Sequence, residues 1–156
     1  MDSLGADIRL VAPTDPEILP LISTHLKLMH ASSPACSVHA MDASDLADAD
    51  AQFFAAYENN TPVAMGALKK LSSSHGELKS MHVRERDRGR GLADAILIHL
   101  LDAARNAGLK KVSLETGSQD AFAPARSFYA RHGFAECPPF EGYELDPNSV
   151  FMTRTL

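Results

Sequence analysis

Apolar residues recur along the chain in two patterns, short runs typical of strands and wider stripes typical of helices. Turn-forming residues separate the central short runs, most clearly at Glu58-Asn59-Asn60-Thr61 and at Ser72-Ser73-Ser74-His75-Gly76. The short runs predict strands, in chain order, at Ile8–Val11, Gln52–Glu58, Pro62–Leu71, Glu77–Val83, Lys111–Leu114, Phe134–Cys137 and Ser149–Leu156.

Apolar residues three and four positions apart predict helices in the longer segments between these strands. The first opens at Thr14-Asp15-Pro16-Glu17, with a capping side chain, a proline and an acid, and runs to Met29. The stretch from Met29 to His39 is interpreted as a loop that faces a substrate. Further helices are expected from Asp42 or Ser44 through Leu46, over Gly91–Asn106 before Gly108, and over Phe122–His132 before Gly133.

The order of these elements predicts the fold class. A strand, helices, three antiparallel strands, a helix, a strand, a helix and final strands make a mixed sheet with helices packed on it, an α/β (α+β) arrangement. The 156 residues suit one domain spanning 1–156. With 45% apolar residues, such a domain can bury an ordinary core.

Composition excludes several classes of partner. The formal net charge of −5 argues against nucleic-acid binding, which needs a broad basic surface. No apolar stretch approaches the roughly 20 residues that cross a membrane. Met1-Asp2-Ser3-Leu4-Gly5 lacks the basic and apolar regions of a signal peptide, and Cys36 and Cys137 suit reduced thiols. We therefore expect a cytoplasmic protein without membrane or nucleic-acid partners.

One glycine-rich turn carries the strongest chemical signal. The run Arg86-Asp87-Arg88-Gly89-Arg90-Gly91 reads as Arg-x-x-Gly-x-Gly between a predicted strand and a predicted helix. Glycines allow a tight turn and close approach of a ligand, and a helix N-terminus offers unpaired N–H groups that bind phosphate. The alternating arginines add positive charge. The turn therefore indicates a small polyanionic cofactor.

A second motif follows about 40 residues later, in Ala125-Arg126-Ser127-Phe128-Tyr129-Ala130-Arg131-His132-Gly133-Phe134. With the glycine-rich turn and the order of elements over nearly the whole chain, it resembles the GNAT superfamily of acetyl-CoA-dependent N-acetyltransferases. More loosely, Gly76–Met81, Leu114–Gly117 and Pro147–Met152 resemble a branch of small bacterial members, the YsnE-like proteins. The resemblance implies the GNAT fold: a mixed, mostly antiparallel twisted sheet of about six or seven strands flanked by about four helices.

The resemblance also implies acetyl-CoA as co-substrate, with no metal. Backbone N–H groups from Arg88 to Ala93 would hold the pyrophosphate, and the pantetheine arm would lie beside Met81-His82-Val83. Many family members carry an asparagine where this chain has Phe122, so that contact is absent or comes from elsewhere. The cofactor-binding residues expected are Met81, His82, Val83, Arg86, Arg88, Gly89, Arg90, Gly91, Leu92, Ala93, Phe122 and Arg126.

Three residues are expected to carry the chemistry. By family position, Glu77 would be the base that deprotonates the amine. A backbone N–H near Met81 would stabilise the oxyanion. The Tyr129 hydroxyl would donate a proton or a hydrogen bond to the leaving thiolate. Glu115 is the second choice of base. Strand alternation predicts Glu77, Lys79, Met81 and Val83 on one face and His82, the third choice, on the other.

Plainer interpretations remain open for several residues. Glu77 can be a hairpin residue paired with Lys79 or Lys70, Tyr129 a core aromatic, and Arg126 a solvated helix residue. Cys36-x-x-His39 is a possible metal half-site, but a structural zinc site needs four ligands, so no metal is expected.

The implied reaction is direct acetyl transfer to an amine of a small molecule, or of a peptide. The alternative is a binding module that senses acetyl-CoA without turnover. The acceptor would bind between Leu26–Leu46 and Phe140–Ser149, and neither segment contains a motif that identifies it. A homodimer would suit the fold.

Overall fold

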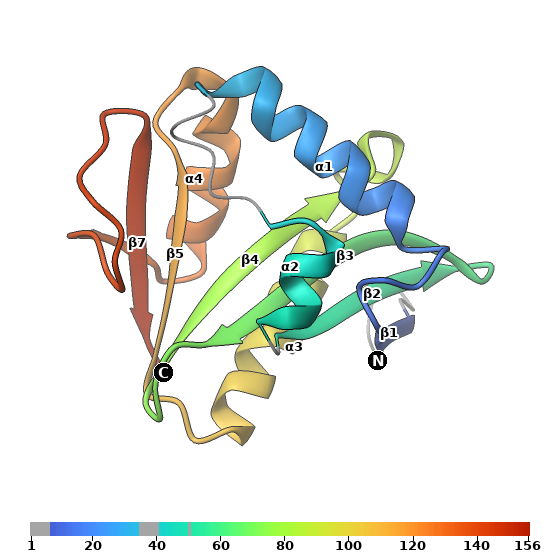
Figure 1. Ribbon diagram of the computed structural model, residues 1–156, viewed down its shortest axis with the longest axis horizontal. Coiled ribbons are helices and arrows are strands. Elements are labelled where there is room, and N and C mark those ends of the chain that lie inside the picture. Colours follow the sequence, from blue (N-terminus) through green and yellow to red (C-terminus); the bar gives the residue numbers. More distant parts are fainter. Residues whose placement is uncertain (1–6, 35–40, 50) are drawn as a thin grey trace.

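The computed structural model describes residues 7–34, 41–49 and 51–156, and its strands form one sheet. The order across the sheet is β1-β2-β3-β4-β5-β7-β6, and neighbours are antiparallel except for β4 and β5 (Figure 1). The mixed, mostly antiparallel sheet expected from the sequence is confirmed. The strands are β1 Asp7–Leu10, β2 Gln52–Glu58, β3 Thr61–Lys70, β4 His75–Val83, β5 Lys111–Gly117, β6 Ala135–Cys137 and β7 Ser149–Thr155.

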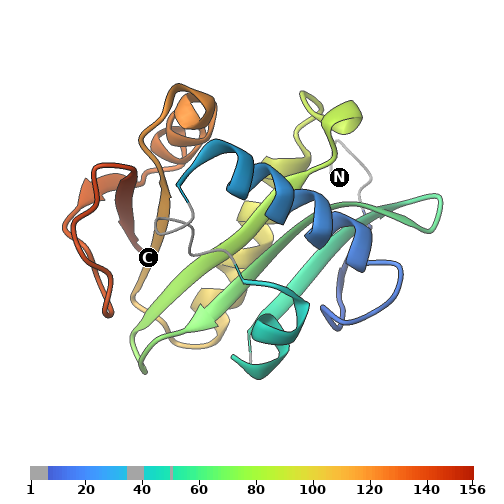
Figure 2. The same cartoon turned by 45° about the horizontal axis from the view of Figure 1, so that its top comes forward.

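Helices cover both faces of the sheet. We call the side under the first two helices the α1 face and the opposite side the α3 face; Figure 2 shows α1 lying across the sheet with α3 behind it. Among the described residues, no helix combines the length and apolar character needed to cross a bilayer. The helices are α1 Leu19–Ser32, α2 Ala43–Asp48, α3 Leu92–Asn106 and α4 Ala123–Arg131, with short 3-10 turns η2 Glu85–Asp87 and η3 Asp120–Phe122.

Each face has its own apolar core, as strand alternation requires. On the α1 face, Ile18, Ile22 and Leu46 pack against alternate residues of β2 and β3. On the α3 face, the stripe of α3 from Ile96 to Ala104 packs against the other residues of these strands and against Leu78 of β4. The amphipathic stripe expected for Gly91–Asn106 is thus the buried face of α3.

Local turn and cap chemistry gives most boundaries, and the largest differences are in α1 and β5. β2 and the turn at Asn59 and Asn60, both with positive φ, are as expected, and Asp42 caps α2 in a capping box with Asp45. However, α1 begins at Leu19 and continues to Ser32, so residues 29–32 are helical, and β5 runs on to Gly117. Packing of α1 against the sheet extends the helix beyond its sequence signals. Pairing of β5 with β7 as far as Gly117 extends the strand in the same way.

The parallel pair β4–β5 is short, and this opens the molecule. The two strands pair only where His75–Glu77 meet Lys111–Ser113, while β5 pairs with β7 along its whole length. Beyond Glu77, the edge of β4 that faces β5 therefore makes no backbone pairing with β5. A cleft opens there between the two strands. Unpaired main-chain groups at such an edge can bind an extended ligand by hydrogen bonds.

A β-bulge interrupts β4 at Ser80. Met65 of β3 pairs with His82 of β4, and Ala67 of β3 pairs with Lys79 of β4. One residue of β3 therefore lies opposite two residues of β4, so β4 carries one extra residue. Ser80, within this segment, has φ +58°. An extra residue exchanges the faces of all residues that follow it.

The bulge corrects the expected faces of β4. Met81 and Val83 pack with Leu78 into the α3-face core, whereas His82 contacts His25 of α1. The prediction that Glu77 and Lys79 share a face with Met81 and Val83, opposite His82, is wrong because it assumed an uninterrupted period of two.

Candidate active site

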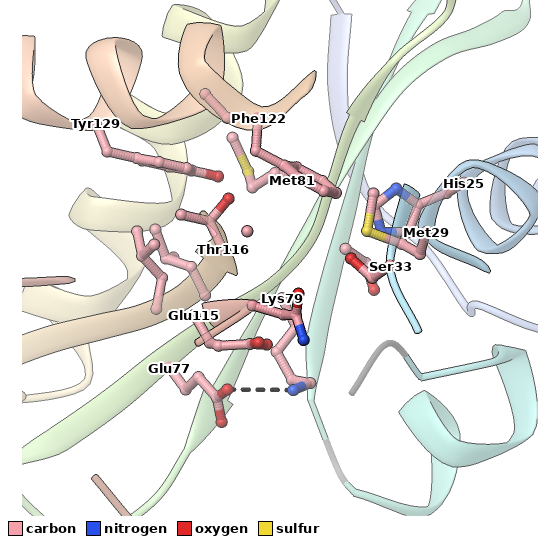
Figure 3. A pocket seen from close by; sticks show the side chains of 16 residues that line it. His25, Met29, Ser33, Glu77, Lys79, Met81, Glu115, Thr116, Phe122 and Tyr129 are labelled. Carbon is pink, nitrogen blue, oxygen red and sulfur yellow. Dashed lines mark hydrogen bonds and ion pairs between the residues drawn. The ribbon is translucent and has the colours of Figure 1, made fainter. Parts of the chain in front are cut away.

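Two adjoining cavities occupy the cleft. The larger, of about 520 Å³, runs from the start of α3 along β4 and α4, and we call it the groove. The smaller, of about 170 Å³, lies between β4 and β5 and is called the inner chamber (Figure 3). The two share six lining residues, His25, Met29, Met81, Phe122, Ala125 and Tyr129. The two cavities therefore adjoin at these residues.

The outer end of the groove is the N-terminus of α3. Gly89, Gly91, Leu92 and Ala93 line it. Gly91 caps the helix with φ +81°, and Gly89 has φ +79°, a backbone region that favours glycine. A helix of 15 residues presents unpaired N–H groups and a positive dipole end here. This end of the groove suits a phosphate.

The arginines of the turn differ in their roles. Arg88 lines the groove and donates from Nε to the Val83 carbonyl oxygen at 3.1 Å. Arg86 is exposed and lines neither cavity, and Arg90 forms an ion pair with Glu58. Of Arg86, Arg88 and Arg90, Arg88 is the one that lines the groove.

Arg126 also lies away from the expected contact. Its Nη1 donates to the carbonyl oxygens of Gly117 at 2.6 Å and Gln119 at 3.0 Å, and it lines neither cavity. These bonds tie α4 to the end of β5, so its placement favours a structural role over binding of a cofactor phosphate.

Coenzyme A fits the groove by its chemistry. Its diphosphate matches the glycine turn, and its amide-containing arm matches the open edge of β4. Apolar residues of α4, including Pro124, Ala125 and Phe128, form the opposite wall. Phe122 lines both cavities and lies on the backbone of Gly117, where an added Cβ would meet its ring at 2.1 Å.

Tyr129 stands where the groove meets the inner chamber. Its ring packs edge-on against Phe128 and Phe134, and only 8% of the residue is exposed. Its hydroxyl points into the chamber (Figure 3). Burial raises the pKa of this phenol above its ordinary value, so Tyr129 is a proton donor throughout the neutral range.

Glu77 and Lys79 of the chamber wall form a closed hydrogen-bonded set with Tyr143. Lys79 Nζ lies 3.1 Å from Glu77 Oε2 and 3.0 Å from the Tyr143 hydroxyl, and that hydroxyl donates to Glu77 Oε2 at 2.6 Å. The pairing of Glu77 with Lys79 is one of the alternatives expected from the sequence. Glu115 lines the same chamber and accepts a hydrogen bond from Ser149 at 2.7 Å.

Several of these residues carried no sequence signal. Tyr143 lies in the connection between β6 and β7, 66 residues from Glu77. His25 lies on α1, at a position expected only to be helical, and Met29 lies on α1 where the sequence predicted the start of a loop that faces a substrate. Tyr143 belongs to the Phe140–Ser149 connection, which the sequence predicted to contribute to the acceptor site. Cys36 and His39 lie outside the described residues, and within those ranges no group of three or more His, Cys, Asp or Glu is placed to hold a metal.

Two buried histidines pack α1 onto β4 beside the groove. The rings of His25 and His82 make an edge contact at 5.3 Å, and each has a buried nitrogen without a hydrogen-bond partner among the described residues. Burial lowers both pKa values to about 4, with smaller effects of His82 on His25 and of Arg88 on His82. Both rings are therefore neutral at pH 7.

This pair predicts acid sensitivity of the fold. Unfolded histidines titrate near pH 6.5, so between about pH 6.5 and 4 the unfolded chain binds more protons than the folded one. The free energy of unfolding, measured in urea, should fall as the pH falls through that range. In the double variant His25→Phe, His82→Phe this slope should flatten; an unchanged slope would contradict the assignment. Burial lowers the pKa of His75 too and should leave a residual slope.

Comparisons with known proteins agree with this geometry. The model of the acetyltransferase (GNAT) family matches residues 21–134. The chain is 40% identical to the uncharacterized N-acetyltransferase YsnE of Bacillus subtilis over 143 residues, covering 92% of this chain and 95% of YsnE. It is 34% identical to an IAA acetyltransferase of Azospirillum brasilense, covering 93% of this chain and 94% of that protein.

A solved structure supports the fold. The PaiA N-acetyltransferase of Thermoplasma acidophilum, in complex with coenzyme A, superposes with a TM-score of 0.75 at 16% identity, covering 97% of this chain and 99% of that one. The family model spans most of the chain and the relatives span nearly all of it. The chain therefore belongs to the acetyltransferase (GNAT) family.

Proposed function

We propose that this protein transfers an acetyl group from acetyl-CoA to the amine of a small molecule, by direct attack within a ternary complex. The observation that carries the proposal is that the two cavities adjoin: the groove has an anion site at α3 and follows the open edge of β4, and the chamber beside it is walled by two carboxylates, Glu77 and Glu115. Tyr129 and Met81 line the junction.

Besides a base, the chain's own residues supply three functions in this proposal. Acetyl-CoA, when bound, supplies the activated acyl group. Backbone N–H groups from Arg88 to Ala93 hold the diphosphate. The N–H near Met81 donates to the oxygen that becomes negatively charged, an interaction typically worth on the order of 10²–10³ in rate. Tyr129 donates its hydroxyl proton or a hydrogen bond to the departing sulfur.

The described cysteine supports direct transfer. Cys137 is on β6 and lines neither cavity, so it is not placed to carry an acyl group.

The base is assigned by a pair of matched substitutions. Glu77 and Glu115 face the chamber from neighbouring strands, and Glu77 is the first choice because it is 3% exposed and held in place by Lys79 and Tyr143. We expect Glu77→Gln to lower kcat/KM by about 10²–10⁴-fold. Glu115→Gln is the matched control. If Glu115→Gln alone caused a loss of this size, the roles would be exchanged.

The competing function is a sensor that binds acetyl-CoA without turnover. Release of free thiol from acetyl-CoA, measured over a panel of amines, amino acids and peptides, separates the two. The panel includes IAA, for which the Azospirillum relative is named. Tight acetyl-CoA binding with no thiol release on any acceptor would favour the sensor.

A further inference from the structure

The groove contains a cation that binding of a diphosphate alone does not require. Among the described residues, the permanently cationic side chains that line the groove are Arg88 and Arg131. Arg88 belongs to the glycine-rich turn, whereas Arg131 ends α4 on the opposite wall. The two histidines of the groove, His25 and His82, are neutral because burial lowers their pKa values to about 4. Arg131 is therefore a second fixed positive charge in this cavity.

Arg131 lies beside the anion site at the start of α3. The residue that follows it, His132, has its Nε2 2.7 Å from Oδ1 of Asp94, which is in the first turn of α3. The carbonyl oxygen of His132 also accepts a hydrogen bond from Arg154 Nη1 at 2.9 Å. These contacts fix the C-terminal end of α4 next to the N-terminus of α3. Arg131 and the backbone N–H groups of the glycine-rich turn therefore lie at the same end of the groove.

The guanidinium of Arg131 is available to a ligand. It lies 5.7 Å from the centre of the Phe128 ring, a favourable cation–π contact, and among the described residues it forms no ion pair. The two carboxylates that line the groove have other partners: Asp94 contacts His132, and Asp87 pairs with a neighbouring arginine at 2.6 Å. Because Arg131 is exposed, a ligand can bind it without breaking an internal ion pair.

Coenzyme A carries a third phosphate besides its diphosphate. This phosphate is a monoester on the ribose 3′ oxygen, and such a group bears a charge of about −1.5 to −2 at pH 7. Only the ribose separates it from the diphosphate, so a ligand whose diphosphate is held at the start of α3 has its monoester at the same end of the groove. A guanidinium suits this group, because it can donate two parallel hydrogen bonds to phosphate oxygens.

We propose that Arg131 binds the 3′-phosphate of acetyl-CoA and makes the protein select the complete coenzyme over its 3′-dephospho form. The inference rests on the proposed function and names a residue that determines donor specificity at the same site. Arg126, the arginine of α4 expected from the sequence to bind the cofactor, donates instead to the carbonyl oxygens of Gly117 and Gln119.

A matched pair of ligands tests the inference without turnover. Acetyl-CoA and 3′-dephospho-acetyl-CoA differ by one phosphate, and calorimetry at fixed ionic strength gives both dissociation constants. We expect the wild-type protein to bind acetyl-CoA about tenfold more tightly, the lower end for a charged hydrogen bond because Arg131 is exposed. Equal affinities would overturn the inference and leave the proposed function intact. Binding of neither ligand would overturn the proposed function itself.

Arg131→Met should abolish this preference. Methionine keeps an unbranched apolar chain beside Phe128 and removes the guanidinium. Acetyl-CoA should therefore bind about tenfold more weakly than to the wild type, while the affinity for the 3′-dephospho form stays unchanged. A preference that persisted in this variant would show that another group binds the phosphate, and an equal loss for both ligands would assign Arg131 to the diphosphate. Either result would overturn the inference.

Two further variants serve as controls. Arg105 is likewise the basic residue in the last turn of its helix, α3, but lines neither cavity. Arg105→Met removes the same charge and the same interaction with a helix C-terminus, and should keep the wild-type preference. A comparable loss there would assign the effect to net charge and contradict the inference. Arg88→Met should weaken both ligands equally; loss of the preference in this variant alone would move the role from Arg131 to Arg88.

Discussion

Gly91→Trp is expected to abolish acetyl-CoA binding, with an affinity loss of about 100-fold or more, or about 2.7 kcal/mol. Gly91 lines the groove at the first turn of α3 and has φ +81°. A non-glycine residue in this conformation costs about 1–2 kcal/mol, and displacement of the turn would redirect the N–H groups that face the phosphate. The indole would also occupy part of the space the ligand needs. Calorimetric titration with acetyl-CoA measures the loss.

The same helix offers a matched control. Gly108, after the C-terminal end of α3, also has φ +81°, and an added Cβ would meet nothing within 4 Å. Gly108→Trp therefore carries the same backbone strain but lies outside both cavities. We expect it to be destabilised to a similar extent and to bind acetyl-CoA like the wild type. If both variants lost binding equally, strain and not the anion site would be the cause.

Tyr129→Phe is expected to lower kcat by about 10²-fold with little change in the KM for acetyl-CoA. Loss of a general acid typically costs 10²–10⁴-fold, and the lower end applies because an alkyl thiol, with a pKa of about 8.5, leaves readily as the thiolate. The ring of Tyr129 is packed between Phe128 and Phe134, and phenylalanine keeps that packing. Steady-state and single-turnover kinetics separate this loss from product release.

The pH dependence distinguishes Tyr129 from a plain core aromatic. Because burial raises its pKa, the phenol should not deprotonate below about pH 10, so the basic limb of the wild-type profile should not belong to it. The hydroxyl faces the chamber (Figure 3), so phenylalanine removes a group that points into the cavity and keeps the packed ring. Unchanged kcat in Tyr129→Phe would restore the core-aromatic interpretation.

The elements were predictable where local signals decide them. β2, the turn at Asn59 and Asn60, the Asp42 cap and the stripe of α3 follow from turn chemistry and periodicity. The family resemblance was readable as well, because the glycine-rich turn and the Tyr129 motif are short continuous segments.

The glycine-rich turn contains a feature that local sequence patterns did not predict, the separate roles of its arginines. Its phosphate-binding character was evident, but Arg86, Arg88 and Arg90 are alike in sequence. Only the fold separates them: Glu58, which is 32 residues from Arg90, forms an ion pair with that side chain, while Arg88 remains at the groove.

The sequence alone determined the fold class, the element order and the segments that hold the site, because propensity, periodicity and capping act between residues a few positions apart. The tertiary structure decided which side chains meet. The bulge at Ser80 placed Glu77, Lys79 and His82 on one face, and a loop 66 residues away brought Tyr143 to Glu77. Such contacts depend on strand register and on packing across the sheet, which no local pattern encodes.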